Sequence, residues 1–247
     1  MDRMIYLAMN GAKQVMVAQS ANAHNLANVN TAGFRADLNH FRAMAQFGDG
    51  QPSRVWSMSE RPGVDLSFGS MQQTGRELDV AVAGHGWLAV QAPDGSEAYT
   101  RAGDLRVTPE GLLTTGAGYP VLGSGGPIAL PQAEKIEIGA DGTVSIRPVG
   151  QAATTLTEVD RIKLVDPPAA ELEKLGDGLL RLRGGATAEP SAEVRLSSGV
   201  VESSNVNSVD ALVNMIELAR RFEMQVKLMK EAEDNDAASA SLMRITG

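Results

Sequence analysis

The stretch "ANAHNLANVNTAGF" (Ala21–Phe34) places four asparagines within nine positions, after an alanine-rich segment and before a glycine. Asn22, Asn25 and Asn28 recur at steps of three, so on a helix they drift by only about 120° and share one broad face. Asn30 to Gly33 fits a type I turn, with asparagine at the first position and glycine at the fourth. The stretch therefore predicts the end of a helix, followed by a turn.

The residues before this turn have the period of a helix with small, uncharged sides. No Asp, Glu, Lys or Arg occurs between Lys13 and Arg35. Small or apolar residues recur at steps of three and four, at Ile5, Ala8, Ala12, Val15, Ala18, Asn22 and Leu26. We expect this helix to approach other helices closely.

A second, longer helix is predicted from Ser208, a suitable N-cap, and no Gly or Pro interrupts the chain from Val209 to Thr246. Its stripe at spacings of three and four consists of Val209, Leu212, Ile216, Ala219, Phe222, Val226 and Met229. Isolated helices are marginal in water, because most helical stability comes from tertiary contacts. We therefore expect the two terminal helices to pair with each other and with neighbouring copies, and to become ordered on assembly.

Between the helices the pattern changes twice. Residues 35–76 are polar and punctuated by Gly and Pro, which predicts an extended linker with room for one short strand. From residue 77 to 198, short β runs alternate with turns, and Asp94-Gly95 and Asp141-Gly142 are favoured hairpin dipeptides. This pattern predicts an antiparallel sandwich or a partly open barrel, in one lobe or two.

The expected fold class is therefore α+β, with terminal helices pairing as a coiled-coil-like inner domain around a central antiparallel β-rich domain. The expected domains are an N-terminal helix (1–34), a linker (35–76), a β-rich outer domain (77–198) and a C-terminal helix (199–247).

Composition excludes several functional classes. The net charge of −8 argues against nucleic acid and anionic membranes as partners, and the absence of cysteine excludes disulfides and thiolate sites. No apolar run reaches the roughly 18 residues that span a bilayer, and a cleaved signal peptide is not expected. His24, His40 and His85 have no companion at ligand spacing, and no catalytic motif is present. We expect no enzyme activity, no cofactor and no metal.

Three segments resemble one family, the bacterial flagellar rod and hook proteins. "NLANVNTAGFR" (Asn25–Arg35) resembles its N-terminal signature, and "SNVNSVDALVNMIELARRFEMQVKLMKEAEDND" (Ser204–Asp236) its C-terminal signature. Between them, the run from "LDVAVAGHGW" to "VTPEGLL" (Leu78–Leu113) is similar to the family's central β domain. Within the family, the opening "MDRMIYLAMNGA" and "IELARRFEMQ" resemble the proximal-rod members most, with the distal-rod members as the nearest alternative.

This resemblance implies an axial building block. Such a subunit leaves the cell through the flagellar type III export apparatus and without a cleaved leader. In the periplasm it joins copies of itself and other rod proteins in a helical tube, which surrounds the export channel and transmits torque. It departs from the family pattern at Val201, where Leu is common, and at His24, where Asn is common. A second class stays open, a secreted β-domain protein that binds cell wall or carbohydrate and oligomerises through its helices.

On this interpretation the site is an assembly interface. We expect Asn25 and Asn28 to hydrogen-bond at the turn, across to the C-terminal helix, or to a neighbouring subunit. The interface residues we predict are Asn22, Asn25, Leu26, Asn28, Thr31, Gly33, Phe34, Ser204, Asn205, Val206, Asn207, Leu212, Met215, Ile216, Phe222 and Val226.

Overall fold

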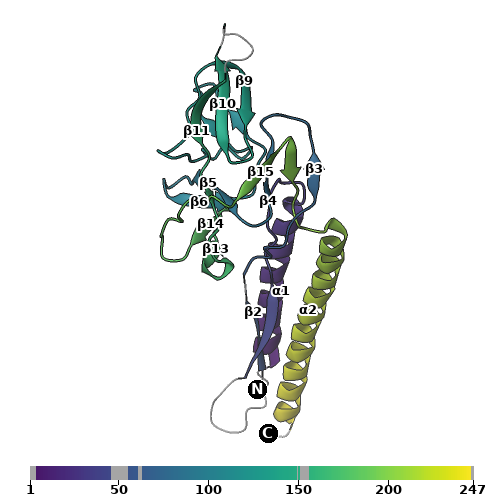
Figure 1. Cartoon of the computed structure of the whole chain (residues 1–247). Coiled ribbons are helices and arrows are strands. Elements are labelled where there is room, and N and C mark those ends of the chain that lie inside the picture. Colours follow the sequence, from purple (N-terminus) through teal and green to yellow (C-terminus); the bar gives the residue numbers. More distant parts are fainter. Residues whose placement is uncertain (1–3, 46–54, 61–62, 149, 151–155, 246–247) are drawn as a thin grey trace. The chain divides into compact units, whose positions relative to one another are not determined.

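The computed structural model describes residues 4–45, 55–60, 63–148, 150 and 156–245 (Figure 1). The chain divides into two compact units. We call Met1–Ala27, Asp37–Gly63 and Asn207–Gly247 the helical unit, and Asn28–Ala36 and Val64–Val206 the β unit. The chain therefore crosses between the units four times, and the predicted α+β class is confirmed.

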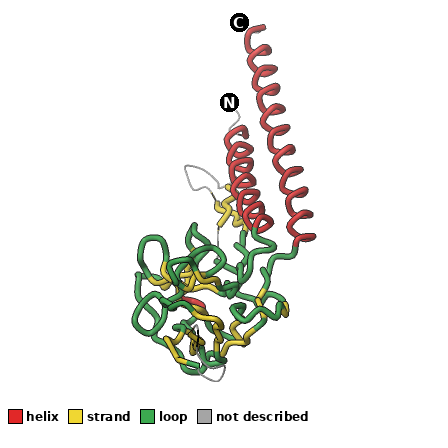
Figure 2. The backbone as a smooth tube through the Cα atoms, turned by 90° about the horizontal axis from the view of Figure 1, so that it is seen from above, coloured by secondary structure: helices red, strands yellow, loops and turns green. Residues whose placement is uncertain are grey.

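The helical unit is built on two antiparallel helices, α1 (Met4–Ala27) and α2 (Ser208–Ile245). Asn22 near the end of α1 bonds to Ala211 near the start of α2, whereas Gly11 faces Gln225 further along. Figures 1 and 2 show the helices side by side, with α2 continuing past the start of α1. The first turn of α2 is capped by Asn207, not by the predicted Ser208. Its Oδ1 accepts from the backbone N–H groups of Val209 (3.0 Å) and Asp210 (3.4 Å), the geometry of an N-cap.

The seam between the helices differs from the predicted stripe. Along α2, seven buried or half-buried residues are spaced alternately by four and three: Ala211, Met215, Leu218, Phe222, Gln225, Met229 and Ala232. Opposite them, Val15 and Ala18 of α1 form a small core with Leu218 and Phe222. Four residues of the predicted stripe are exposed instead: Val209, Leu212, Ile216 and Val226. Periodicity alone did not distinguish the two seams, because α2 carries apolar residues on both faces.

The predicted linker holds a hairpin that belongs to the helical unit. Strand β1 (His40–Ala45) pairs antiparallel with β2 (Val55–Glu60), and Asn10 of α1 donates to the Ser57 carbonyl at 2.8 Å. All of β1 is exposed. The sequence pattern missed β1 because this strand shows no alternation between buried and exposed positions, the signal on which a strand prediction depends.

Within its described residues the β unit contains fourteen strands, and the pairings between them are antiparallel. One sheet has five strands in the order β12-β5-β6-β14-β13, and another has three in the order β11-β10-β9. Three two-stranded pairs are β15-β4, β16-β3 and β7-β8. The bounds are β3 Met71–Gln73, β4 Val80–Ala83, β5 Trp87–Gln91, β6 Glu97–Thr100, β7 Arg106–Val107, β8 Leu113–Thr114, β9 Ala133–Ile138, β10 Thr143–Pro148, β11 Thr157–Arg161, β12 Leu164–Val165, β13 Leu172–Lys174, β14 Leu180–Leu182, β15 Arg195–Ser198 and β16 Val200–Glu202, with a short 3₁₀ helix at Ala169–Glu171.

Both predicted hairpins are present. Gly95 (φ +82°) turns the chain between β5 and β6, and Gly142 (φ +88°) turns it between β9 and β10. Each loop is longer than the two residues that the dipeptide suggested. Val80, Leu88, Val90 and Leu105 are fully buried in the main core of this unit. Aliphatic residues dominate this core, as the low aromatic content predicted.

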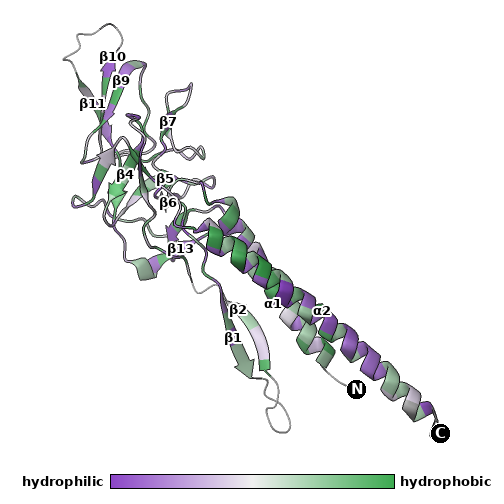
Figure 3. Cartoon of the chain, turned by 90° about the vertical axis from the view of Figure 1, so that its right-hand side faces the viewer, coloured by the Kyte–Doolittle hydropathy of each residue, from purple (hydrophilic) through white to green (hydrophobic). Residues whose placement is uncertain are grey.

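In the described part of the chain, neither long helix has a stretch apolar enough to cross a membrane. Coloured by hydropathy, α1 is largely apolar and the second half of α2 largely polar (Figure 3).

Candidate assembly site and chain connections

The N-terminal signature forms a double turn directly after α1. Asn28 accepts two bonds from Thr31, one from its backbone N–H and one from its hydroxyl, both at 3.1 Å. A second turn follows, in which the Phe34 N–H donates to the Thr31 carbonyl. The single turn predicted from Asn30 to Gly33 is therefore replaced by turns at 28–31 and 31–34. The Gly33 N–H does not close the predicted turn but donates to the carbonyl of Glu202 in the C-terminal signature, at 2.8 Å.

Gly33 occupies a place that no other residue fits. Its φ of +64° lies in the left-handed region, which side chains with a Cβ disfavour. A Cβ at this position would also lie 2.1 Å from the backbone carbonyl carbon of Arg101. The glycine therefore allows the signature turn to contact the chain beyond β6.

Asn25 ties the end of α1 to the segment that follows the turn, within the helical unit. Its Nδ2 donates to the Asp37 carbonyl (2.9 Å), and its Oδ1 accepts from the Asp37 N–H (2.8 Å). The Asp37 carboxylate contacts His24 Nδ1 at 2.9 Å. One turn earlier, Asn22 Nδ2 donates to the carbonyl of Ala211 on α2 at 2.7 Å. The side-chain amides of both asparagines thus hydrogen-bond to backbone groups of another segment, as a backbone amide would.

Removing the Asn25 side-chain amide tests its hydrogen bonds to Asp37. We expect Asn25→Ala to lower the free energy of unfolding by about 1–3 kcal/mol, because the Asp37 N–H and carbonyl both lose their partner. Urea unfolding followed by circular dichroism measures the change. Asn30→Ala, at an exposed asparagine five residues on, is the matched control and should change stability by less than about 0.5 kcal/mol. Equal effects of the two substitutions would show that the Asp37 bonds contribute nothing specific.

In the β unit, Asn205 likewise hydrogen-bonds to backbone groups of other segments. Its Oδ1 accepts from the Ala36 N–H (2.8 Å), and its Nδ2 donates to the carbonyls of Asp65 (2.9 Å) and Ser67 (3.2 Å). The Asp65 N–H in turn donates to the Ala36 carbonyl. One side chain therefore cross-links three segments, each of which lies beside a crossing between the units.

A buried charge cluster, Arg35, Arg101 and Glu202, lies next to Asn205. The Glu202 side chain is fully buried, and it accepts from Arg35 Nη2 (2.6 Å) and from Arg101 Nη1 (3.0 Å). It also accepts from the Gly69 N–H at 2.8 Å. Burial lowers the pKa of the Arg101 guanidinium, and the Glu202 carboxylate opposes that shift. One carboxylate thus compensates two buried cations, which makes it costly to remove.

Aromatic rings cover the cations of this cluster. The guanidinium carbons of Arg35 and Arg101 lie 5.7 Å and 5.2 Å from the Trp87 ring centroid, and Arg101 lies 4.8 Å from that of Phe68. Within the described residues, Nε and Nη1 of Arg35 and Nε of Arg101 have no hydrogen-bond partner. Cation–π attraction compensates part of that loss.

The sequence prediction missed all three charges of the cluster. The sequence nevertheless carries a signal for two of them, because Arg35 and Glu202 are each isolated from other charged residues along the chain. Arg35 is the first Asp, Glu, Lys or Arg after Lys13, and Glu202 is the only one between Arg195 and Asp210. A single charge within a long small or apolar stretch has no neighbour to pair with locally, so it needs a distant partner.

The structure brings together some of the predicted interface residues and not others. Asn25 and Asn28 hydrogen-bond at the turn, as predicted, and Phe34 is buried with Lys174 Nζ 3.9 Å from its ring centroid. Phe222 packs against Val15 and Ala18 of α1, and Met215 is half-buried, whereas Leu212, Ile216 and Val226 are exposed. Leu26 and Val206 are half-buried. Ser204 is buried, and its Oγ accepts a local hydrogen bond from the Val206 N–H.

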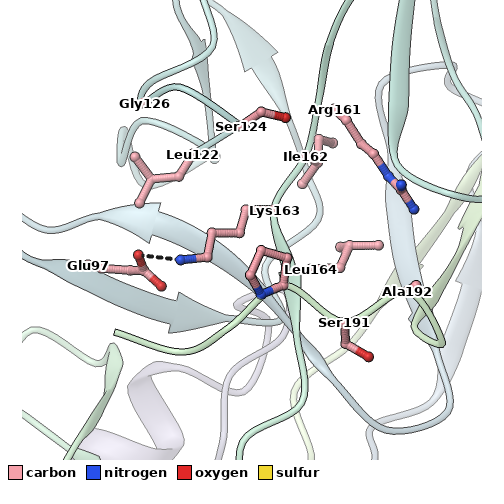
Figure 4. Close-up of a pocket in the computed structure, with 12 residues that line it drawn as sticks. Glu97, Leu122, Ser124, Gly126, Arg161, Ile162, Lys163, Leu164, Ser191 and Ala192 are labelled. Carbon is pink, nitrogen blue, oxygen red and sulfur yellow. Dashed lines mark hydrogen bonds and ion pairs between the residues drawn. The ribbon is translucent and has the colours of Figure 1, made fainter. Parts of the chain in front are cut away.

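The β unit also holds a pocket of about 480 Å³ (Figure 4). Across it Lys163 Nζ contacts Glu97 Oε2 at 2.8 Å, and the other Glu97 oxygen accepts from the buried Tyr99 hydroxyl. Burial raises the pKa of Tyr99 to about 12, so this hydroxyl stays a donor at neutral pH. The lining residues include no aromatic side chain, so they offer a sugar ring no stacking surface.

Comparison with known proteins identifies the family. The model described as the flagellar hook protein FlgE/F/G D1 domain matches residues 81–146, and the flagellar basal body rod FlgEFG protein C-terminal model matches residues 197–242. The chain is 44% identical to the flagellar basal-body rod protein FlgF of Escherichia coli, with 100% of both chains covered. The FlgF of Salmonella typhimurium is 43% identical over the same coverage. The chain belongs to the flagellar basal-body rod protein family.

A relative with another name is less similar to this rod-family chain. The FlgG rod protein of Bacillus subtilis is 31% identical, over 95% of this chain and 96% of its own. The resemblance inferred from the three sequence segments is therefore confirmed. Arg101 lies in the first matched region, and Glu202 and Asn205 lie in the second, so the buried cluster joins the two.

Proposed function

We propose that this chain is a structural subunit of the proximal part of the flagellar rod and that it assembles through its helical unit. The observation that carries the assembly route is the apolar surface that the helix pair leaves exposed. At the start of α2, Leu212 and Ile216 are 49% and 56% exposed, with Val209 and Val213 beside them. On α1 the exposed apolar residues are Met4, Ile5, Tyr6, Met9, Met16 and Val17.

Each helix therefore has two apolar faces. One face forms the seam within the chain, and the other presents partly exposed apolar side chains, onto which we propose that a helix of another subunit packs. Contiguous exposed apolar surface of this kind marks an interaction site in a soluble protein. The two exposed groups differ from each other, so copies of the chain and other rod proteins would join by heterologous contacts, which can extend into a helical tube.

The distribution of charge supports the same surface. The β unit carries 12 basic and 19 acidic residues, and the helical unit 10 and 11, so the net charges are −7 and −1. Copies repel less through helical units of nearly zero net charge than through β units. The terminal helices would then form a coiled-coil-like inner layer around the export channel, with the β unit outside.

The family resemblance supports the remaining parts of the proposal. The subunit would pass through the flagellar type III apparatus without a cleaved leader, and would act in the periplasm as a torque-transmitting element rather than an enzyme. The proximal position rests on the FlgF proteins of Escherichia coli and Salmonella typhimurium, which are 44% and 43% identical to this chain, whereas the FlgG of Bacillus subtilis is 31% identical.

Deletion of the gene from its own bacterium tests this function. We expect loss of swimming and of complete rods, and recovery of both when the chain is supplied with an internal tag in the exposed Ser96 loop of the β unit. The tagged chain should copurify with isolated basal bodies. A deletion strain with normal motility, or a chain found with cell-wall fragments and absent from basal bodies, would refute the proposal.

A further inference from the structure

Four crossings join the two units, and the residues on the β-unit side of these crossings share one network. The segments involved are 28–36, 64–67 and 202–206. Their contacts are the Asn205 side-chain bonds to Ala36, Asp65 and Ser67, and the Glu202 bonds to Gly33 and Arg35. Every one of these contacts lies within the β unit.

The C-terminal segment supplies the central groups of this network. Glu202 offers its backbone carbonyl to the Gly33 N–H and its carboxylate to Arg35, and Asn205 offers its N–H to the Phe34 carbonyl. Within segment 28–36, contacts to the rest of the β unit also come from Lys174, whose Nζ donates to the Arg35 carbonyl at 2.6 Å. The N-terminal segment is thus held mainly by residues that lie more than 160 positions later in the chain.

We propose that Glu202 and Asn205 form a latch, a pair of positioning residues that holds the N-terminal signature turn on the β unit. The strands of the main core do not depend on this pair, because Val80, Leu88 and Val90 are buried among other aliphatic side chains. When the latch is weakened, segments 28–36 and 64–69 detach while the core strands stay folded. Local opening below the global unfolding free energy is a general property of segments held by few polar contacts.

The latch also implies an order in which segments of the β unit become fixed. Segment 28–36 cannot be fixed until residues 202–205 are in place, so the connection from α1 stays open until the end of the β unit is available. The consequence for assembly rests on the proposed function: an open connection leaves α1 unpositioned for the inner layer.

Asn205→Asp is the substitution that tests the latch in the free full-length chain. It keeps the acceptor for the Ala36 N–H but replaces the donor to Asp65 and Ser67 by a carboxylate oxygen. We expect hydrogen exchange at the backbone amides of Gly33, Ala36, Asp65 and Gly69 to rise by about tenfold or more, because the bonds that hold their segments to residues 202–205 are weakened. The amides of β5 and β6 should keep their protection.

Glu202→Gln adds an independent spectroscopic readout. In a Trp56→Phe background, Trp87 is the remaining tryptophan, and two guanidiniums lie against its ring. Loss of the carboxylate should displace them and shift the Trp87 emission. Glu97→Gln, which cuts the Lys163 ion pair in the same unit, is the matched control and should alter neither the emission nor the exchange of segment 28–36.

The outcomes separate clearly. Faster exchange confined to segments 28–36 and 64–69 supports the latch. A uniform rise that includes β5 and β6, or no rise at all, overturns it. Because these measurements use the monomer, such a failure would leave the proposed rod function standing. Normal motility after deletion of the gene would refute that function and leave the latch untouched.

Discussion

Replacing Leu212 and Ile216 together by aspartate is expected to abolish incorporation into rods while the folded monomer survives. Both side chains are exposed on α2, one and two turns from its capped start, and neither is part of the seam with α1. Exposed substitutions away from packed contacts change stability by about 0.5 kcal/mol or less. In an assembled interface, by contrast, a buried unpaired carboxylate costs several kcal/mol. Motility and the amount of chain in isolated basal bodies measure the first effect.

Thermal unfolding of the purified double variant measures the second effect, and its midpoint should stay within about 4 °C of the parent chain. Leu175→Asp, at a residue of the β unit that is 41% exposed, is the control for the added charge. It should retain motility. If the Leu175 variant failed to assemble and the double variant assembled normally, the apolar face of α2 would not be the interface.

The sequence predicted the elements that depend on local pattern. The end of α1, the long α2, the hairpins at Gly95 and Gly142 and the aliphatic core each have a signal within a short window, in glycine placement or in period. Asn25 and Asn28 were placed at the turn for the same reason, because an asparagine beside a helix end has few other ways to satisfy its amide.

Contacts between distant segments were not predictable in this way. Arg35 and Glu202 are separated by 167 positions, and nothing in either motif specifies the other. The face of α2 that meets α1 is chosen by fit against the small side chains of α1, such as Gly11 opposite Gln225, and not by the apolar period alone. Strand β1 was not predicted for a third reason, because a strand with all its residues exposed has no alternating pattern to detect.

The substitution Gly33→Ala is expected to destabilise the monomer by about 3 kcal/mol or more. Two costs add at this position. An alanine in the left-handed region costs about 1–2 kcal/mol from backbone sterics alone. The new Cβ would also meet the Arg101 carbonyl carbon at 2.1 Å and the Ala102 nitrogen at 2.3 Å, and both are backbone atoms that no rotamer change can move. Segment 28–36 must therefore shift, which also strains the Gly33 bond to Glu202.

Gly75→Ala separates the two costs, because Gly75 has a similar φ of +72° but open space where its Cβ would lie. We expect this control to lose only the backbone contribution, about 1–2 kcal/mol, in the same urea unfolding experiment. The difference between the two variants then reports the close approach of the signature turn to the chain after β6. If Gly33→Ala cost no more than Gly75→Ala, the turn would have room to move away from Arg101. In that case the signature glycine would serve only the left-handed backbone, and the tight contact between the N-terminal turn and the β unit would not be required for the fold.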